Sequence, residues 1–104
     1  MNTIEFLSPR EAYAAHIMGS LIVDVRDAKD VATQRVGVNQ FLNIPFSDLD
    51  ARLGEIPQSK QVVFVSRVGV KGKAAAKMAA ERGYLAANID GGLTAWQADG
   101  FPVQ

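Results

Sequence analysis

Cysteine is absent from this chain of 104 residues. Its absence excludes disulfides, thiolate metal sites and a cysteine nucleophile. An excess of one charge is absent as well, because 11 Lys and Arg balance 11 Asp and Glu. Nothing global therefore favours nucleic acid or an acidic membrane as a partner. Any preference for anions must be local.

Long apolar runs are also missing. Stretches such as Val62–Val65 fall far short of the roughly 20 residues that cross a bilayer. The N-terminus lacks the basic and apolar regions of a signal peptide, and we expect a cytoplasmic protein. The chain is 48% apolar and 21% charged, which is typical of globular proteins. We expect residues 1–104 to form one domain.

Short β-like runs alternate with helical segments along the chain. Strands are predicted at 4–7, 21–25, 41–44, 62–65 and 87–89. Helices are predicted from a capping box at 8–11 to about 18, after a cap at Ser47, over 73–82 and after 91–92, with a loop or short helix at 28–34. This alternation predicts an α/β fold with a central, mainly parallel sheet of about five strands and helices on both faces. Ligands bind such sheets beyond the carboxyl ends of the strands.

One strand end carries a loop with the composition of an anion site. Val62–Val65 leads into Ser66, Arg67, Val68, Gly69, Val70, Lys71 and Gly72, and then into helix. A tight loop before a helix offers unpaired N–H groups and the positive end of the helix dipole. Arg67, Lys71 and Lys73 add positive charge, and the glycines permit the backbone angles of a cradle. Spacing alone favours an anion site and an ordinary strand-to-helix connection equally.

The same loop resembles the active-site loop of the rhodanese (thiosulfate sulfurtransferase) family, Cys-Arg-x-Gly-x-Arg-Ser/Thr. Other family features follow in order: Asp24-Val25-Arg26, Asn43-Ile44-Pro45, Gly83-Tyr84, the run from Asp90-Gly91-Gly92 to Trp96, and Gly100-Phe101-Pro102-Val103. The resemblance covers essentially the whole chain. It implies a rhodanese-like three-layer fold and no cofactor. It also implies, as partner, a small sulfur-containing anion or a protein that donates or accepts a persulfide.

Three positions depart from the family pattern. Ser66 stands where the family has its catalytic cysteine. Lys71 replaces the second loop arginine and is followed by Gly72 rather than Ser or Thr. The usual Gly-His-Ile before Asn-Ile-Pro is replaced by Arg35-Val36-Gly37, with extra residues before Phe41. The first departure bears on chemistry and the others on loop geometry.

Ser66 determines whether the family's sulfur-transfer chemistry is possible in this chain. In that chemistry a thiolate attacks the outer sulfur of a donor such as thiosulfate, becomes a persulfide and passes the sulfur to an acceptor. A serine hydroxyl forms no S–S bond, so we expect no persulfide-dependent turnover. We expect the loop still to bind a small oxyanion or a persulfidic ligand. Phosphatase loops of this kind need arginine six positions after the nucleophile, and that position is Gly72.

Two alternatives stay open at this point. In one, the chain is a protein-interaction module whose loop binds nothing specific. In the other, the native protein is an active sulfurtransferase and Ser66 is an engineered replacement, although the departures at Lys71 and Gly72 favour natural change. For Asp24 and Arg26 the resemblance implies that they hold the loop in shape, against the alternative of an ordinary ion pair.

Some remaining polar and aromatic residues are interpreted structurally. His16 has no second metal-ligating partner nearby in sequence and is expected on a helix surface. Leu93 and Trp96 are expected in the core. Asp48 and Asp50 suit the first turn of a helix rather than a catalytic carboxylate pair.

Overall fold

The computed structural model describes residues 3–104. Its strands are β1 (Glu5–Leu7), β2 (Leu21–Asp24), β3 (Phe41–Asn43), β4 (Val62–Val65) and β5 (Ala86–Ile89). Its helices are α1 (Pro9–Ile17), α2 (Ala28–Thr33), α3 (Phe46–Arg52), the 3-10 turn η1 (Leu53–Glu55), α4 (Val70–Glu81) and α5 (Gly92–Ala98). The five strands pair in the order β1-β5-β4-β2-β3, and every pairing is parallel. The predicted α/β fold with a parallel five-stranded sheet is confirmed.

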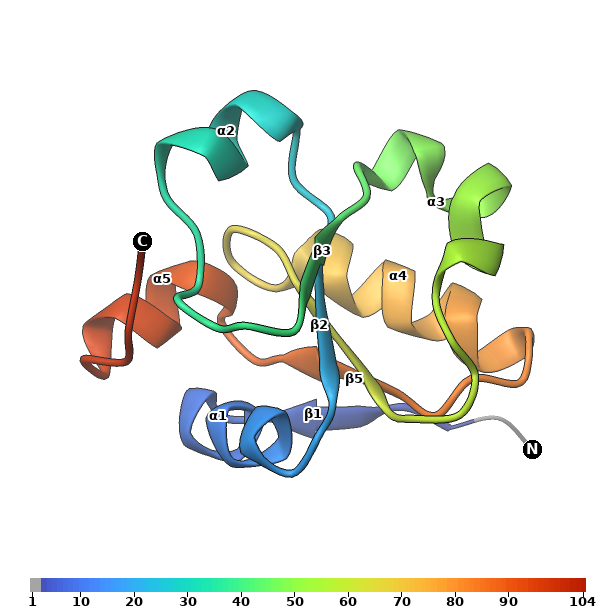
Figure 1. Ribbon diagram of the computed structural model, residues 1–104, viewed down its shortest axis with the longest axis horizontal. Helices are drawn as coiled ribbons and strands as arrows, with labels where there is room; N and C mark the ends of the chain where they lie inside the picture. The colour runs from blue at the N-terminus through green and yellow to red at the C-terminus, as the bar shows by residue number, and fades with distance from the viewer. Residues whose placement is uncertain (1–2) are drawn as a thin grey trace.

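Alternation along the inner strands builds a core on each face of the sheet. In β4, Val62 and Phe64 belong to one buried cluster, while Val63 and Val65 belong to the other. Successive side chains of a strand point to opposite faces, and a strand covered on both faces becomes a continuous apolar run. The first cluster lies under α3 and α4, and the second packs against α1 and α5. Figure 1 shows these two helical layers, with α2 beyond the upper ends of β2 and β3.

The C-terminal aromatic residues complete the second core. Trp96 is fully buried, its ring lies 5.9 Å from that of Tyr13, and its Nε1 donates to the carbonyl of Pro102 over 2.7 Å. Leu93 is also buried, so both residues pack where the sequence predicted. His16 is half-buried on α1, and its Nε2 accepts a 3.4 Å hydrogen bond from the backbone of Gln40.

Several element boundaries differ from the sequence predictions. Helix α4 begins at Val70, three residues before the predicted start, because Gly69 turns the chain into it at φ 101°. Ser47 is not a helix cap, since α3 begins at Phe46 with Pro45 at the N-cap position. The segment predicted as a loop or short helix forms α2. The capping box is present in α1, where Ser8 and Glu11 bond each other's backbone. Among residues 3–104, no helix has the length and apolar character to cross a membrane.

Candidate functional site

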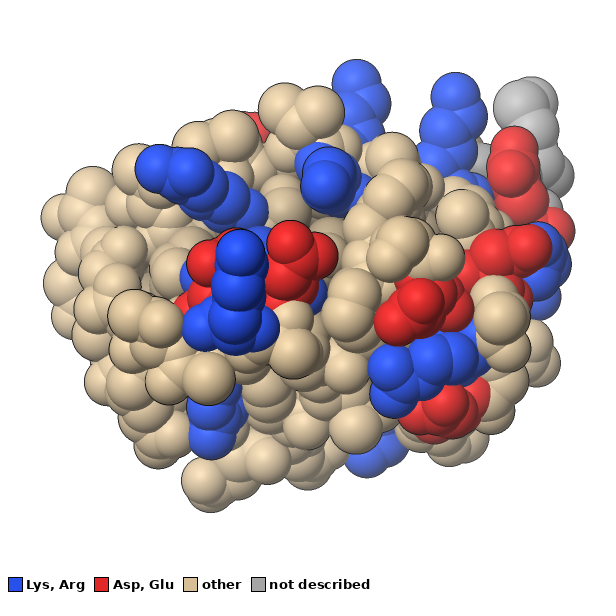
Figure 2. Space-filling model, turned by 90° about the horizontal axis from the view of Figure 1, so that it is seen from above, with Lys and Arg blue, Asp and Glu red and all other residues tan. Residues whose placement is uncertain are grey.

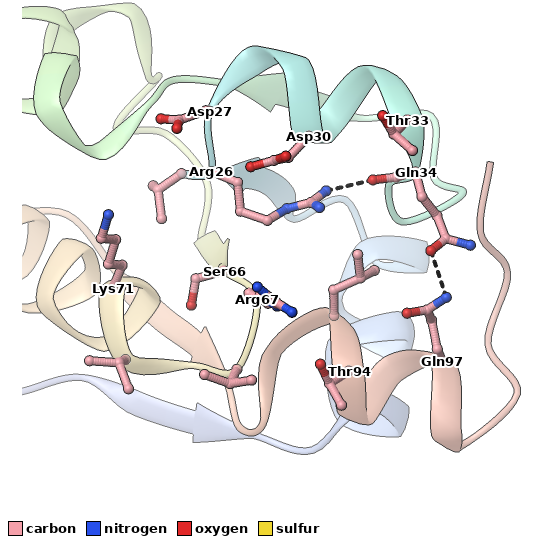
Figure 3. A pocket seen from close by; sticks show the side chains of 14 residues that line it. Arg26, Asp27, Asp30, Thr33, Gln34, Ser66, Arg67, Lys71, Thr94 and Gln97 are labelled. Carbon is pink, nitrogen blue, oxygen red and sulfur yellow. Dashed lines mark hydrogen bonds between the residues drawn. The ribbon is translucent and has the colours of Figure 1, made fainter.

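An open cavity of about 790 Å³ lies at the carboxyl ends of β2 and β4. Its lining comes from three segments: Val25, Arg26, Asp27, Asp30, Thr33 and Gln34 in and before α2; Ser66, Arg67, Val68, Val70 and Lys71 in and before α4; and Leu93, Thr94 and Gln97 in α5. Figure 3 shows α2 facing the 66–71 segment across this space. Most of the predicted anion loop therefore lines one cavity, while Gly69 and Gly72 shape its backbone.

Ser66 lies at the floor of the loop, directly after β4. Only 4% of its surface is exposed. Its Oγ accepts two backbone hydrogen bonds, from the N–H of Gly69 and from the N–H of Gly72, each 3.0 Å long. The loop thus closes around this side chain and aims two amide donors at the atom that a nucleophile at position 66 would present.

Gly72 has no room for a side chain. A Cβ built on it would lie 2.3 Å from Oδ1 of Asn88 and 3.1 Å from Oγ of Ser66. Asn88, in β5, is 2% exposed, and its Nδ2 donates to the carbonyl of Gly69 over 3.3 Å. Its Oδ1 is buried and has no hydrogen-bond partner among residues 3–104. The asparagine amide therefore supports the loop from below and occupies the space beside Gly72.

The first turn of α5 holds the loop from the other side. The N–H groups of Leu93 and Thr94 donate to the carbonyls of Ser66 and Arg67 over 2.8 Å and 3.0 Å. A Cβ on Gly92 would lie 2.3 Å from the carbonyl oxygen of Ser66, which is why this close approach requires glycine. Neither this support nor that of Asn88 was predicted from the sequence. The glycine pair was the available signal, since it marks close backbone contact.

The mouth of the loop presents unpaired donors and unpaired cations. Within residues 3–104, the backbone N–H groups of Arg67, Val68, Val70 and Lys71 have no protein hydrogen-bond partner. Arg67 and Lys71 form no ion pair in this same part of the chain. Both line the cavity, and Figure 3 shows the Lys71 side chain extending toward the side on which Asp27 lies. Helix α4 has no acidic residue in its first turn. Basic residues there oppose the helix dipole, so the arrangement disfavours an empty loop and suits a bound anion.

Asp24 and Arg26 form the base of the opposite wall. Asp24 is fully buried and pairs with the guanidinium of Arg26 at 2.8 Å. Arg26 also donates to the carbonyl of Gln34 over 2.6 Å, and the side chain of Asn43 donates to the carbonyls of Asp24 and Arg26. These side-chain bonds fix the segment that carries α2. That the pair shapes the 66–72 loop stays a prediction.

Comparison with known proteins identifies the fold. The sequence profile of the rhodanese-like domain matches residues 7–99. This chain belongs to the rhodanese-like domain family. The rhodanese-like chain is 30% identical over 84 residues to a protein of Allochromatium vinosum named sulfurtransferase, covering 80% of this chain and 77% of that protein. It is 27% identical over 81 residues to YtwF of Bacillus subtilis, covering 78% and 77%.

A solved structure gives the same result for the fold. The crystal structure of a rhodanese-related protein from Thermoplasma volcanium matches with a TM-score of 0.88 over 96% of this chain and 97% of that one, at 21% identity. The family resemblance and the three-layer rhodanese-like fold are confirmed.

The segment that replaces the usual Gly-His-Ile of rhodanese-like domains lies outside the cavity lining. Arg35 exchanges two backbone hydrogen bonds with Gln104, of 2.9 Å and 2.8 Å, and Val36 forms an antiparallel bridge with Val103. The guanidinium of Arg35 also lies 4.3 Å from the ring centre of Phe41. This departure ties the C-terminal residues to the domain rather than altering the walls of the cavity.

Proposed function

We propose that this rhodanese-like domain binds a small oxyanion or persulfidic sulfur ligand in its 66–72 loop and does not transfer the sulfur. The observation that carries the proposal is the ring of donors around Ser66. Gly69 and Gly72 donate to its Oγ at 3.0 Å, and four further loop N–H groups have no partner within the described residues. Preorganised amide donors beside a helix N-terminus stabilise an anion.

The absence of turnover follows from the element at position 66. We propose that Ser66 occupies the place of the family's nucleophilic cysteine. A thiolate there would displace sulfite from thiosulfate by attack on the outer sulfur, and the resulting S–S bond would then be broken by a thiophile such as cyanide. The hydroxyl of serine is a far weaker acid than a thiol. It also attacks through oxygen rather than sulfur, so no persulfide forms on serine. Its hydroxyl can still donate a hydrogen bond to an oxyanion in the loop.

The test compares thiosulfate:cyanide sulfurtransferase activity in the parent and in Ser66→Cys. We expect no thiocyanate from the parent and measurable turnover from the variant, because the two donors that face Oγ would then face a thiolate. Turnover by the parent would contradict the proposal. Inactivity of a folded Ser66→Cys variant would mean that the departures at Lys71 and Gly72 also prevent sulfur transfer.

Binding is measured separately, by titrating the parent with thiosulfate, sulfate and phosphate and following backbone amide shifts. Shifts confined to residues 66–73 support the binding loop. No shift at millimolar ligand would refute it.

A protein-interaction module is a second candidate, because two apolar side chains at the rim of the cavity are exposed. Val68 is 54% exposed and Val70 is 74% exposed. Contiguous exposed apolar surface marks contact sites, and a protein persulfide donor would meet this rim first. A partner that shifts the amides of this rim while small anions shift nothing would favour the second candidate.

A further inference from the structure

Two carboxylates on the α2 side of the cavity are unused by the fold. Asp27 stands at the N-cap position of α2 but makes no side-chain cap bond. Asp30 lies in the first turn of the same helix. Both line the cavity and are exposed, and neither has an ion pair or a side-chain hydrogen bond to residues 3–104. Figure 3 shows both carboxylates on the wall opposite the 66–71 segment.

The other wall holds two cations that also have no ion-pair partner among residues 3–104. Arg67 and Lys71 line the cavity, and the described residues give them no acidic partner. The third cation of the lining, Arg26, is matched by buried Asp24 at 2.8 Å. Two positive and two negative charges without partners among residues 3–104 therefore share the lining of this cavity. Figure 2, a view from above, likewise shows basic and acidic side chains close together, with neither sign forming a continuous patch.

The size of the cavity adds an independent constraint. Its volume of about 790 Å³ lies within the range of sites for whole small molecules, about 300 to 1,000 Å³. Thiosulfate has five heavy atoms and would fill a small part of it. The far side is polar, where Nε2 of Gln97 donates to Oε1 of Gln34 across the opening over 2.8 Å. The cavity suits a ligand with a polar body beyond its anionic end.

We infer that the ligand is a sulfur-substituted amino acid or short peptide with a free ammonium group. Its anionic sulfur end would lie in the 66–72 loop and its ammonium beside Asp27 and Asp30. This inference rests on the proposed function and specifies its ligand. A dianion such as thiosulfate is attracted by the cationic wall and repelled by the acidic one. A molecule that carries both charges is attracted by both walls. A persulfide on a protein cysteine lacks the neighbouring ammonium.

The experiment uses three probes on the full chain: S-sulfocysteine, which carries an S-sulfonate, a carboxylate and an ammonium; N-acetyl-S-sulfocysteine, which keeps both anionic groups and lacks the ammonium; and thiosulfate. Amide-shift titrations give the affinity and the location of each. We expect the parent to bind S-sulfocysteine about fivefold more tightly than its N-acetyl form, the size expected for two solvent-screened contacts.

The double variant Asp27→Asn/Asp30→Asn tests the contribution of the acidic wall separately from that of the cationic wall. In this variant we expect the preference for S-sulfocysteine to disappear and thiosulfate to bind about threefold more tightly, because a repulsion is removed. The matched control is Asp48→Asn/Asp99→Asn, which makes the same change in net charge outside the cavity lining and should keep the parent's preference.

The outcomes keep this inference apart from the proposed function. If none of the probes shifts residues 66–73, the proposed binding loop fails. If thiosulfate shifts them but the parent treats the acetylated and free forms alike, or the Asp27→Asn/Asp30→Asn variant retains the preference, the loop stands and the amino-acid ligand is overturned.

Discussion

Helices α1 and α4 both follow parallel strands, yet their first turns are built in opposite ways. In α1, Ser8 Oγ accepts from the N–H of Glu11 at 3.1 Å while the N–H of Ser8 donates to Glu11 at 2.9 Å. Proline at the first position of that helix has no N–H to satisfy. Helix α4 has Gly69 at its N-cap without a capping side chain, and Lys71 follows in its first turn.

One shared bond makes the difference informative. In each helix a serine hydroxyl accepts the N–H of the third residue, Glu11 in α1 and Gly72 in α4. Ser8 is itself the N-cap, whereas Ser66 lies three residues before the N-cap of α4. The extra residues form a loop whose other donors remain unpaired. The first arrangement stabilises a helix, and the second leaves backbone donors available, as the proposed ligand site requires.

The largest effect is expected from placing a side chain at the third position of α4. In Gly72→Ala the new Cβ would lie 2.3 Å from Oδ1 of Asn88, which is buried and held through its amide to Gly69. Overpacking costs about 1–3 kcal/mol and the gain in helix propensity offsets about 1. Because the clash is with a buried side chain, the cost should lie at the upper end of that range, and we expect the free energy of unfolding, measured in urea, to fall by about 2 kcal/mol.

A matched control for that change is Gly54→Ala, since a Cβ there has nothing within 4 Å. It should change stability by less than about 1 kcal/mol. Adding Asn88→Ala to Gly72→Ala should recover part of the loss. A Gly72→Ala protein as stable as the parent would show that the asparagine moves freely and does not set the loop.

Removing the two serine hydroxyls compares the two first turns directly. Ser66→Ala leaves two N–H groups without their acceptor at a site that is 4% exposed, and we expect a loss of about 2 kcal/mol. Ser8→Ala acts at an exposed cap and should cost about 1 kcal/mol. Urea unfolding measures both. Sulfate titration should be unaffected by Ser8→Ala, and a loss of binding there would break the contrast between the two helices.

The same contrast explains what could be predicted from the sequence. Local signals predicted the capping box at Ser8 and the apolar strand Val62–Val65, because each feature is determined within a few residues. The start of α4 was misplaced, since a glycine N-cap followed by Val70 and Lys71 lacks the usual start signals. The supports from Asn88 and Leu93 were missed because they are contacts between segments more than 18 residues apart, which no local pattern contains.

The smallest expected effect reverses the charge that opposes the α4 dipole. Lys71→Glu places an anion at the positive end of the helix, and we expect unfolding to cost about 0.5 kcal/mol more. The same change removes a cation from the cavity lining, so thiosulfate should bind about fivefold more weakly. Lys77→Glu, on the exposed middle of the same helix, makes an equal change in charge where the dipole acts weakly, and it should change stability and affinity little.

A gain in stability without a loss of affinity would mean that Lys71 opposes the helix dipole but does not contribute to anion binding. A loss of both would mean that Lys71 stabilises the fold. The expected combination, more stable and less able to bind, is the signature of a residue retained for function at a cost in stability.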